Sequence, residues 1–69
     1  MQVTAVLTPA KEGGFVAYNP ETGTTSQGET IENAIANLRE AVELYLEMFP
    51  LPAGGPPLVT SFDVDAHAA

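Results

Sequence analysis

The chain has 69 residues, nine acidic against two basic side chains, and a formal net charge of −7. This length leaves room for one domain, and the lack of cysteine excludes disulfides and thiolate-bound metals. Because Lys11 and Arg39 are the only basic residues, the chain cannot neutralise a series of phosphates, and we expect no direct binding to nucleic acid or to an anionic membrane. No apolar run could cross a bilayer and no signal core opens the chain, so a cytoplasmic protein is expected.

The N-terminal part of the chain predicts three short β-strands. Residues 2–8 are rich in β-branched side chains and roughly alternate, which predicts the first strand. A turn with the pair Gly13 and Gly14 leads to a second strand over residues 14–18, so these two strands should form an antiparallel hairpin. The threonine-rich residues 24–27 predict a third strand that is exposed on one side.

A helix is predicted from residue 31 to residue 49. Thr30 is a suitable N-cap because its hydroxyl can accept an amide hydrogen of the first turn. Pro50 and Pro52 end the helix because proline cannot continue it. One apolar stripe recurs at spacings of three and four and should face the core: Ile31, Ala34, Ile35, Leu38, Ala41, Val42, Tyr45 and Phe49.

Residues 58–64 alternate again and predict a fourth strand, with Leu58, Thr60, Phe62 and Val64 on one face. A strand that follows a helix can return to the sheet by a crossover. The predicted fold is therefore a single α+β domain over residues 1–69 with the order β-β-β-α-β, a mostly antiparallel sheet and one helix on one face.

Three separated stretches of the chain resemble the HicB family of antitoxins from bacterial and archaeal toxin–antitoxin systems. These stretches are GFVAYNPE at residues 14–21, SQGETIENA at 26–34 and NLREAVELYL at 37–46. The family has a glycine and a strand running into proline, then SQGDTLEEA, then a helix ending in LYLE. The resemblance implies a partly degraded ribonuclease-H-like fold and binding to a small, basic, HicA-like toxin that cleaves RNA. The C-terminal DNA-binding domain of many family members is not expected in this chain, which puts promoter autoregulation in doubt.

Three glutamates, Glu40, Glu43 and Glu47, share one side of the predicted helix. They could be metal ligands of a residual nuclease, but the first strand supplies no acid to complete a two-metal site. They could also be an ordinary solvated face. A third interpretation is binding to a basic partner, because acids near a helix C-terminus oppose the helix dipole and a sequence that keeps them may use them.

These observations favour a binding protein over an enzyme, and no catalytic, metal or cofactor site is predicted. The leading hypothesis is an antitoxin that blocks its toxin sterically and electrostatically. An orphan structural or adaptor domain that has lost its toxin is the alternative, and a residual metal-dependent nuclease ranks below both. His67, the only histidine, is expected to be a surface residue. A core this small favours self-association, and we expect a homo-oligomer of at least two copies that pairs through the edge strand Thr24, Thr25, Ser26 and Gln27.

Overall fold

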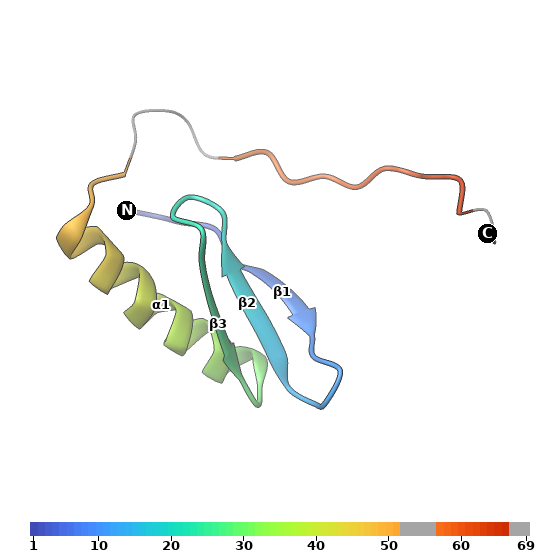
Figure 1. Ribbon diagram of the computed structural model, residues 1–69, viewed down its shortest axis with the longest axis horizontal. Helices are drawn as coiled ribbons and strands as arrows, with labels where there is room; N and C mark the ends of the chain where they lie inside the picture. The colour runs from blue at the N-terminus through green and yellow to red at the C-terminus, as the bar shows by residue number, and fades with distance from the viewer. Residues whose placement is uncertain (52–56, 67–69) are drawn as a thin grey trace.

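A computed structural model describes residues 1–51 and 57–66, in which an antiparallel sheet of three strands packs one helix on one face (Figure 1). The strand order is β1-β2-β3, so β2 is central and the other two strands are edges. This arrangement confirms the predicted α+β class and the succession of three strands and a helix. The elements are β1 (Val6–Pro9), β2 (Phe15–Asn19), β3 (Thr24–Gly28) and α1 (Ile31–Met48).

The register of the sheet decides which side chains meet the helix. Leu7 pairs with Ala17 and Ala17 pairs with Ser26, so these three side chains lie on the same face, toward α1. The alternate residues of β2, among them Tyr18, point to the uncovered face. At the end of β3, a Cβ on Gly28 would collide with the backbone nitrogen of Ala34. Only glycine allows the helix to approach β3 this closely.

Helix α1 begins and ends as its sequence predicts. The Thr30 hydroxyl accepts the amide hydrogen of Asn33 at 3.0 Å and donates to the Asn33 side-chain oxygen at 2.6 Å. At the other end the Phe49 amide donates to the Tyr45 carbonyl at 2.8 Å, and Phe49 itself is extended. A residue before proline is disfavoured in the helical region, so Pro50 stops the helix at this point.

The core between sheet and helix is small, and part of the predicted apolar stripe lies outside it. Its fully buried apolar members are Ala17, Ala34, Leu38 and Val42, with Leu7, Phe15 and Leu46 packed around them. Phe49 is 54% exposed, and Ile31 and Ile35 are also exposed, which corrects the prediction that the whole stripe is core. The cause is length: a helix of 18 residues is about 27 Å long, whereas strands of five residues extend roughly 17 Å. The ends of α1 therefore extend beyond the sheet.

The fourth strand predicted over residues 58–64 is not formed. Residues 57–66, here called the C-terminal segment, have no regular secondary structure and are exposed throughout. Figure 1 shows the segment passing above the sheet without joining it. An alternating sequence forms a strand only when it finds a sheet edge for its backbone hydrogen bonds, and this segment has none in the single chain. The glycine and proline pairs of residues 53–57 also predict a turn. Residues 52–56 and His67 lie outside the described residues.

The first strand is shorter than predicted because the preceding residues have a different partner. The Thr4 amide donates to both carboxylate oxygens of Glu21, at 3.0 and 3.1 Å, and the Thr4 hydroxyl donates to one of them at 2.9 Å. Because Thr4 is bonded to a side chain rather than to a strand, regular pairing starts only at Val6. Residues 1–5 are held beside the sheet without forming part of it.

The completely buried side chain of Asn19 joins this contact to the turn between β2 and β3. Its amide nitrogen donates to the Thr4 carbonyl at 2.7 Å and to Glu21 Oε1 at 2.8 Å. Its amide oxygen accepts the Thr22 amide at 2.9 Å and the Thr22 hydroxyl at 2.6 Å. We call this group (Thr4, Asn19, Glu21 and Thr22) the Asn19 clamp. No buried side-chain polar atom of the described residues lacks a hydrogen-bond partner.

Replacing Asn19 should destabilise the protein far more than an equivalent change on the surface. Asn19→Ala leaves the buried groups of the clamp without partners, so we expect it to lower the free energy of unfolding by about 1–3 kcal/mol. Asn37→Ala is the matched control, because Asn37 is exposed and makes a single bond, to the Gln27 carbonyl at 2.7 Å. Urea denaturation followed by circular dichroism measures both. Equal losses for the two variants would contradict the role of the clamp.

The clamp should also weaken in acid. Partial burial raises the pKa of Glu21, but hydrogen bonds from the amide and hydroxyl of Thr4 and from Asn19 together lower it more, so the net pKa lies below its ordinary 4.5. The stabilisation is therefore present above that value and is lost as pH falls through the folded-state pKa. The difference in unfolding free energy between wild type and Glu21→Gln should be constant above about pH 5 and shrink below it. Glu12→Gln, in an exposed turn, should show no such trend.

Candidate protein-binding surface

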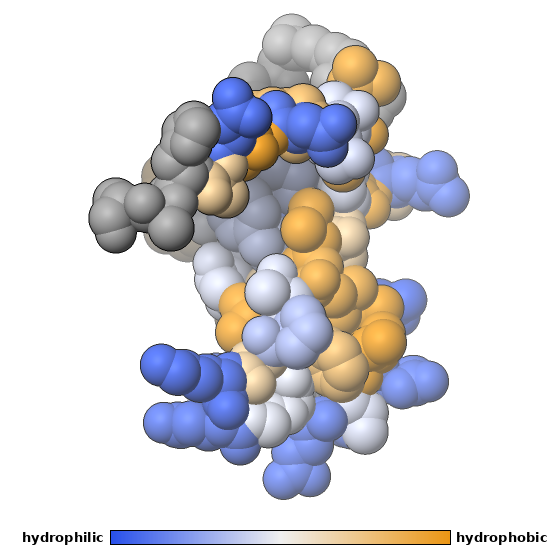
Figure 2. Space-filling model, turned by 90° about the vertical axis from the view of Figure 1, so that its right-hand side faces the viewer, coloured by the Kyte–Doolittle hydropathy of each residue, from blue (hydrophilic) through white to orange (hydrophobic). Residues whose placement is uncertain are grey.

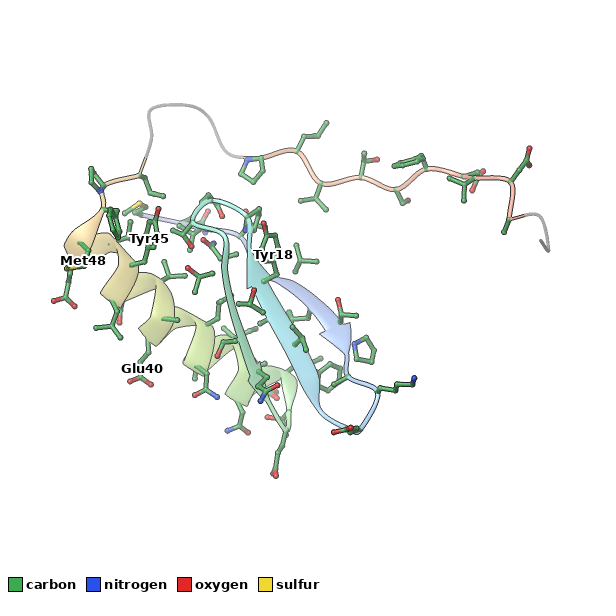
Figure 3. All side chains as sticks on the ribbon, in the orientation of Figure 1. Tyr18, Glu40, Tyr45 and Met48 are labelled. Carbon is green, nitrogen blue, oxygen red and sulfur yellow. The ribbon has the colours of Figure 1, made fainter. Side chains whose placement is uncertain are left out.

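The three glutamates singled out by sequence are on the outer side of α1. Glu40, Glu43 and Glu47 are all exposed, and Figure 3 shows Glu40 pointing away from the sheet. No basic residue occupies the last turn of the helix. The negative charges therefore stand near the negative end of the helix dipole without a cation of that turn to offset them.

Two large apolar side chains lie beside these glutamates. Leu44 is 64% exposed and Met48 is 74% exposed, and Figure 3 shows Met48 at the C-terminal end of α1. Because Glu40, Leu44 and Met48 follow one another at intervals of four, they share one side of the helix. We call Glu40, Glu43, Leu44, Glu47 and Met48 the acidic–apolar face. Its apolar members were not predicted from the sequence, although Leu44 and Met48 lie four and eight positions after Glu40, a spacing that puts them on the same side of a helix.

Strand β3 lies at one edge of the sheet, as predicted for residues 24–27. Thr24 and Ser26 are half-buried, whereas Thr25 and Gln27 are exposed. Helix α1 packs chiefly on this strand and then on β2. The Asn37 amide donates to the Gln27 carbonyl at 2.7 Å, so this acceptor already has a partner within the chain. Pairing of this edge with a second copy remains a prediction.

A groove of about 500 Å³ runs along the opposite side of the helix. It lies between α1 and residues 1–5, which directly precede β1 in the chain. We call it the β1-side groove; residues 1–5 form one wall, and the other is formed by Ile35, Leu38, Arg39, Val42, Glu43 and Leu46. Figure 2, which views the molecule from the side where β1 lies, shows apolar side chains gathered there with hydrophilic ones around them. The helix spacing could have indicated a wide apolar stripe, but not that the sheet leaves part of it uncovered.

Residues 1–51 and 57–66 contain neither a cluster of metal-binding side chains nor a membrane-crossing helix. Among them, no group of three histidine, cysteine, aspartate or glutamate side chains is arranged so that it could hold a metal ion. Glu40, Glu43 and Glu47 therefore do not converge on one ion site. Within the same ranges, no helix has both the length and the apolar character needed to cross a membrane. What the surface offers is an acidic–apolar face and a groove, and both are suited to binding a protein.

Removing charge from the acidic–apolar face should not harm the fold. The double change Glu43→Gln and Glu47→Gln removes a repulsive pair and an unfavourable contact with the dipole, so we expect unchanged or higher stability, by about 1 kcal/mol at most. Glu32→Gln is the control: Glu32 is an exposed acid in the first turn, where the dipole favours negative charge, so its loss should lower stability slightly. Thermal unfolding at low salt compares the variants. A clear loss of stability in the double variant would mean that these acids support the fold.

Two curated proteins of Synechocystis sp. are similar to this chain. UPF0150 protein ssr1765 is 47% identical over 45 residues, which cover 64% of this chain and 57% of that protein. UPF0150 protein ssl0738 is 40% identical over 47 residues, which cover 67% of this chain and 65% of that protein. The chain thus spans less than two thirds of the length of either relative. No family model and no solved structure matches. The homologues of this small α+β domain are UPF0150 proteins.

Proposed function

We propose that this domain is a HicB-like antitoxin that binds and neutralises a small, basic, RNA-cleaving toxin of the HicA type. The observation that carries the proposal is the acidic–apolar face on α1, in a chain with nine acidic and two basic residues. The three stretches similar to HicB antitoxins support it, since the third of them, residues 37–46, contributes Glu40, Glu43 and Leu44 to this face. The proposed site of action is the cytoplasm, and the chain itself makes no contact with nucleic acid.

Electrostatics gives the face a preference for a basic partner. An enzyme that cleaves RNA must carry positive charge where it holds the phosphates. An acidic cover competes with RNA for that surface and also accelerates the encounter, because complementary fields steer association. The acids cost stability where they stand, near the C-terminal end of α1 and without a cation in its last turn. A sequence that keeps these acids despite the loss of stability is understandable if the acids bind a partner.

The apolar members of the face supply what charge alone does not. Interfaces have an apolar centre inside a polar rim, and the affinity comes mainly from side chains buried in that centre. Leu44 and Met48 are apolar and exposed, with Glu40 and Glu47 beside them. Methionine adapts its shape to a partner because its side chain is unbranched and flexible. We expect Leu44 and Met48 to be covered by the toxin while the glutamates contact its basic residues.

The test first looks for a gene for a small basic protein beside the gene for this chain and then measures association with that protein. Glu43→Gln with Glu47→Gln should slow association several-fold at low salt and flatten its salt dependence, because steering depends on these charges. Glu12→Gln with Glu29→Gln is the matched control, since it makes the same change in net charge at exposed positions outside the face. Leu44→Ala should instead accelerate dissociation.

Equal association rates for both double variants at low and high salt would show that the face does not bind the toxin. The absence of any such neighbouring protein, or a failure of the wild-type chain to bind it, would favour an orphan structural or adaptor domain.

A further inference from the structure

The C-terminal segment has the pattern of a strand but no sheet to join. Leu58, Thr60, Phe62 and Val64 alternate with other residues, and Leu58 and Phe62 are 91% and 83% exposed. The radius of gyration of 14.3 Å exceeds the ~11 Å expected of a compact domain of this length, which reflects the extended segment. A free strand with one apolar face is ready to add to a sheet edge.

The β1-side groove has the features such a strand needs. The outer edge of β1 has no neighbour in the sheet. The helix wall offers the exposed Ile35 and the half-buried Leu46 to the apolar face of an incoming strand, with the buried Leu38 and Val42 beside them. The groove also contains Arg39, one of two basic residues in the chain, whereas the C-terminal segment carries Asp63 and Asp65. The free strand edge, the apolar wall of the helix and the charge of Arg39 each match a feature of the C-terminal segment.

We propose that the C-terminal segment of one copy inserts as a fourth strand into the β1-side groove of a second copy, so that two chains exchange segments reciprocally. The segment of the same chain stays away from this groove in the structure (Figure 1). The connection over residues 50–57 contains four prolines, and proline-rich linkers act as semi-rigid spacers. Reciprocal exchange of an identical element is a low-cost route to a symmetric dimer.

Strand exchange at the β1 side accounts for more of the exposed apolar side chains than pairing of two copies at β3 does. Helix α1 packs chiefly on β3, and the Gln27 carbonyl of this strand is already bonded to Asn37. Strand exchange at the other side would bury Ile35 together with Leu58 and Phe62, which are exposed in the single chain. It also enlarges a core that has only four fully buried apolar side chains. The acidic–apolar face keeps Glu40, Leu44 and Met48 outside the exchanged strand.

The absence of cysteine allows a direct test on the full chain, because every disulfide then reports an engineered position. Ala5→Cys lies in the groove wall, and Thr60→Cys and Ser61→Cys sample the two faces of the segment. A mixture of Ala5→Cys with either segment variant should form a disulfide-linked heterodimer under mild oxidation, and Leu44→Cys in place of Ala5→Cys should not. A double variant carrying both cysteines that yields only an intrachain disulfide would overturn the proposal. So would the absence of any disulfide in a monomeric protein, which leaves the groove open to another partner.

Sedimentation equilibrium gives an independent measure that separates the interface from folding. Phe62→Asp alters a side chain that is 83% exposed in the single chain, so it should leave the fold intact and raise the dimer dissociation constant at least about tenfold. Ser61→Asp adds the same charge to the opposite face and should change it by about twofold or less. Ile35→Asp in the groove is compared in the same way with Leu44→Asp on the outer helix, and melting curves check that each variant is folded. Equal dissociation constants within each pair would refute the proposed exchange.

Discussion

The completely buried amide of Asn19 is the interaction on which the rest of the structure depends. Residues 1–5 have no strand partner, and the bonds from Thr4 to Asn19 and Glu21 hold them beside the sheet. The same amide fixes the turn between β2 and β3 through Thr22. Every donor and acceptor in this group is satisfied, so the arrangement is specific rather than merely compact. Because residues 1–5 form one wall of the β1-side groove, the clamp also determines that this groove exists.

A mismatch between helix and sheet determines which surfaces are left for binding. Strands of four and five residues cannot cover a helix of 18 residues. The apolar side chains of α1 that the sheet does not reach remain exposed, at the ends and along both flanks. A larger sheet would bury them, and the domain would be more stable alone. Folding therefore leaves apolar side chains exposed on two sides of one helix, and exposed apolar patches mark places where a partner is expected.

Local sequence signals predicted the elements, and non-local geometry accounts for the differences. Thr30, the apolar spacing of three and four, and Pro50 define α1 to within a residue, because caps and helix periodicity depend on near neighbours only. The three strands follow from alternation and from glycine turns for the same reason. Whether residues 58–64 form a strand depends on whether a sheet edge is available to them, and the alternation of apolar and polar residues in the sequence cannot show that. The clamp depends on Thr4 meeting Glu21, 17 positions away, and the sequence motif at residues 14–21 gave no sign of it. The acids of the candidate site could be predicted from the sequence. The exposure of Leu44 and Met48 could not, because it depends on how little of the helix the sheet covers.

The two proposed interfaces adjoin on α1 and share one residue, while Glu40, Leu44 and Met48 lie outside the groove. Glu43 stands between them: it lines the groove, and it is adjacent to Glu40 and Glu47 on the acidic side. Association of two chains of charge −7 opposes itself at long range, since the dimer carries twice that charge. Arg39 is placed where it lessens this repulsion, inside the groove and facing a segment that brings Asp63 and Asp65. The charge that hinders dimerisation helps the other task, because a dimer with two acidic–apolar faces attracts a basic protein more strongly than one chain does. In the proposed dimer, self-association would therefore enlarge the small core and at the same time concentrate the negative field that a basic toxin would meet.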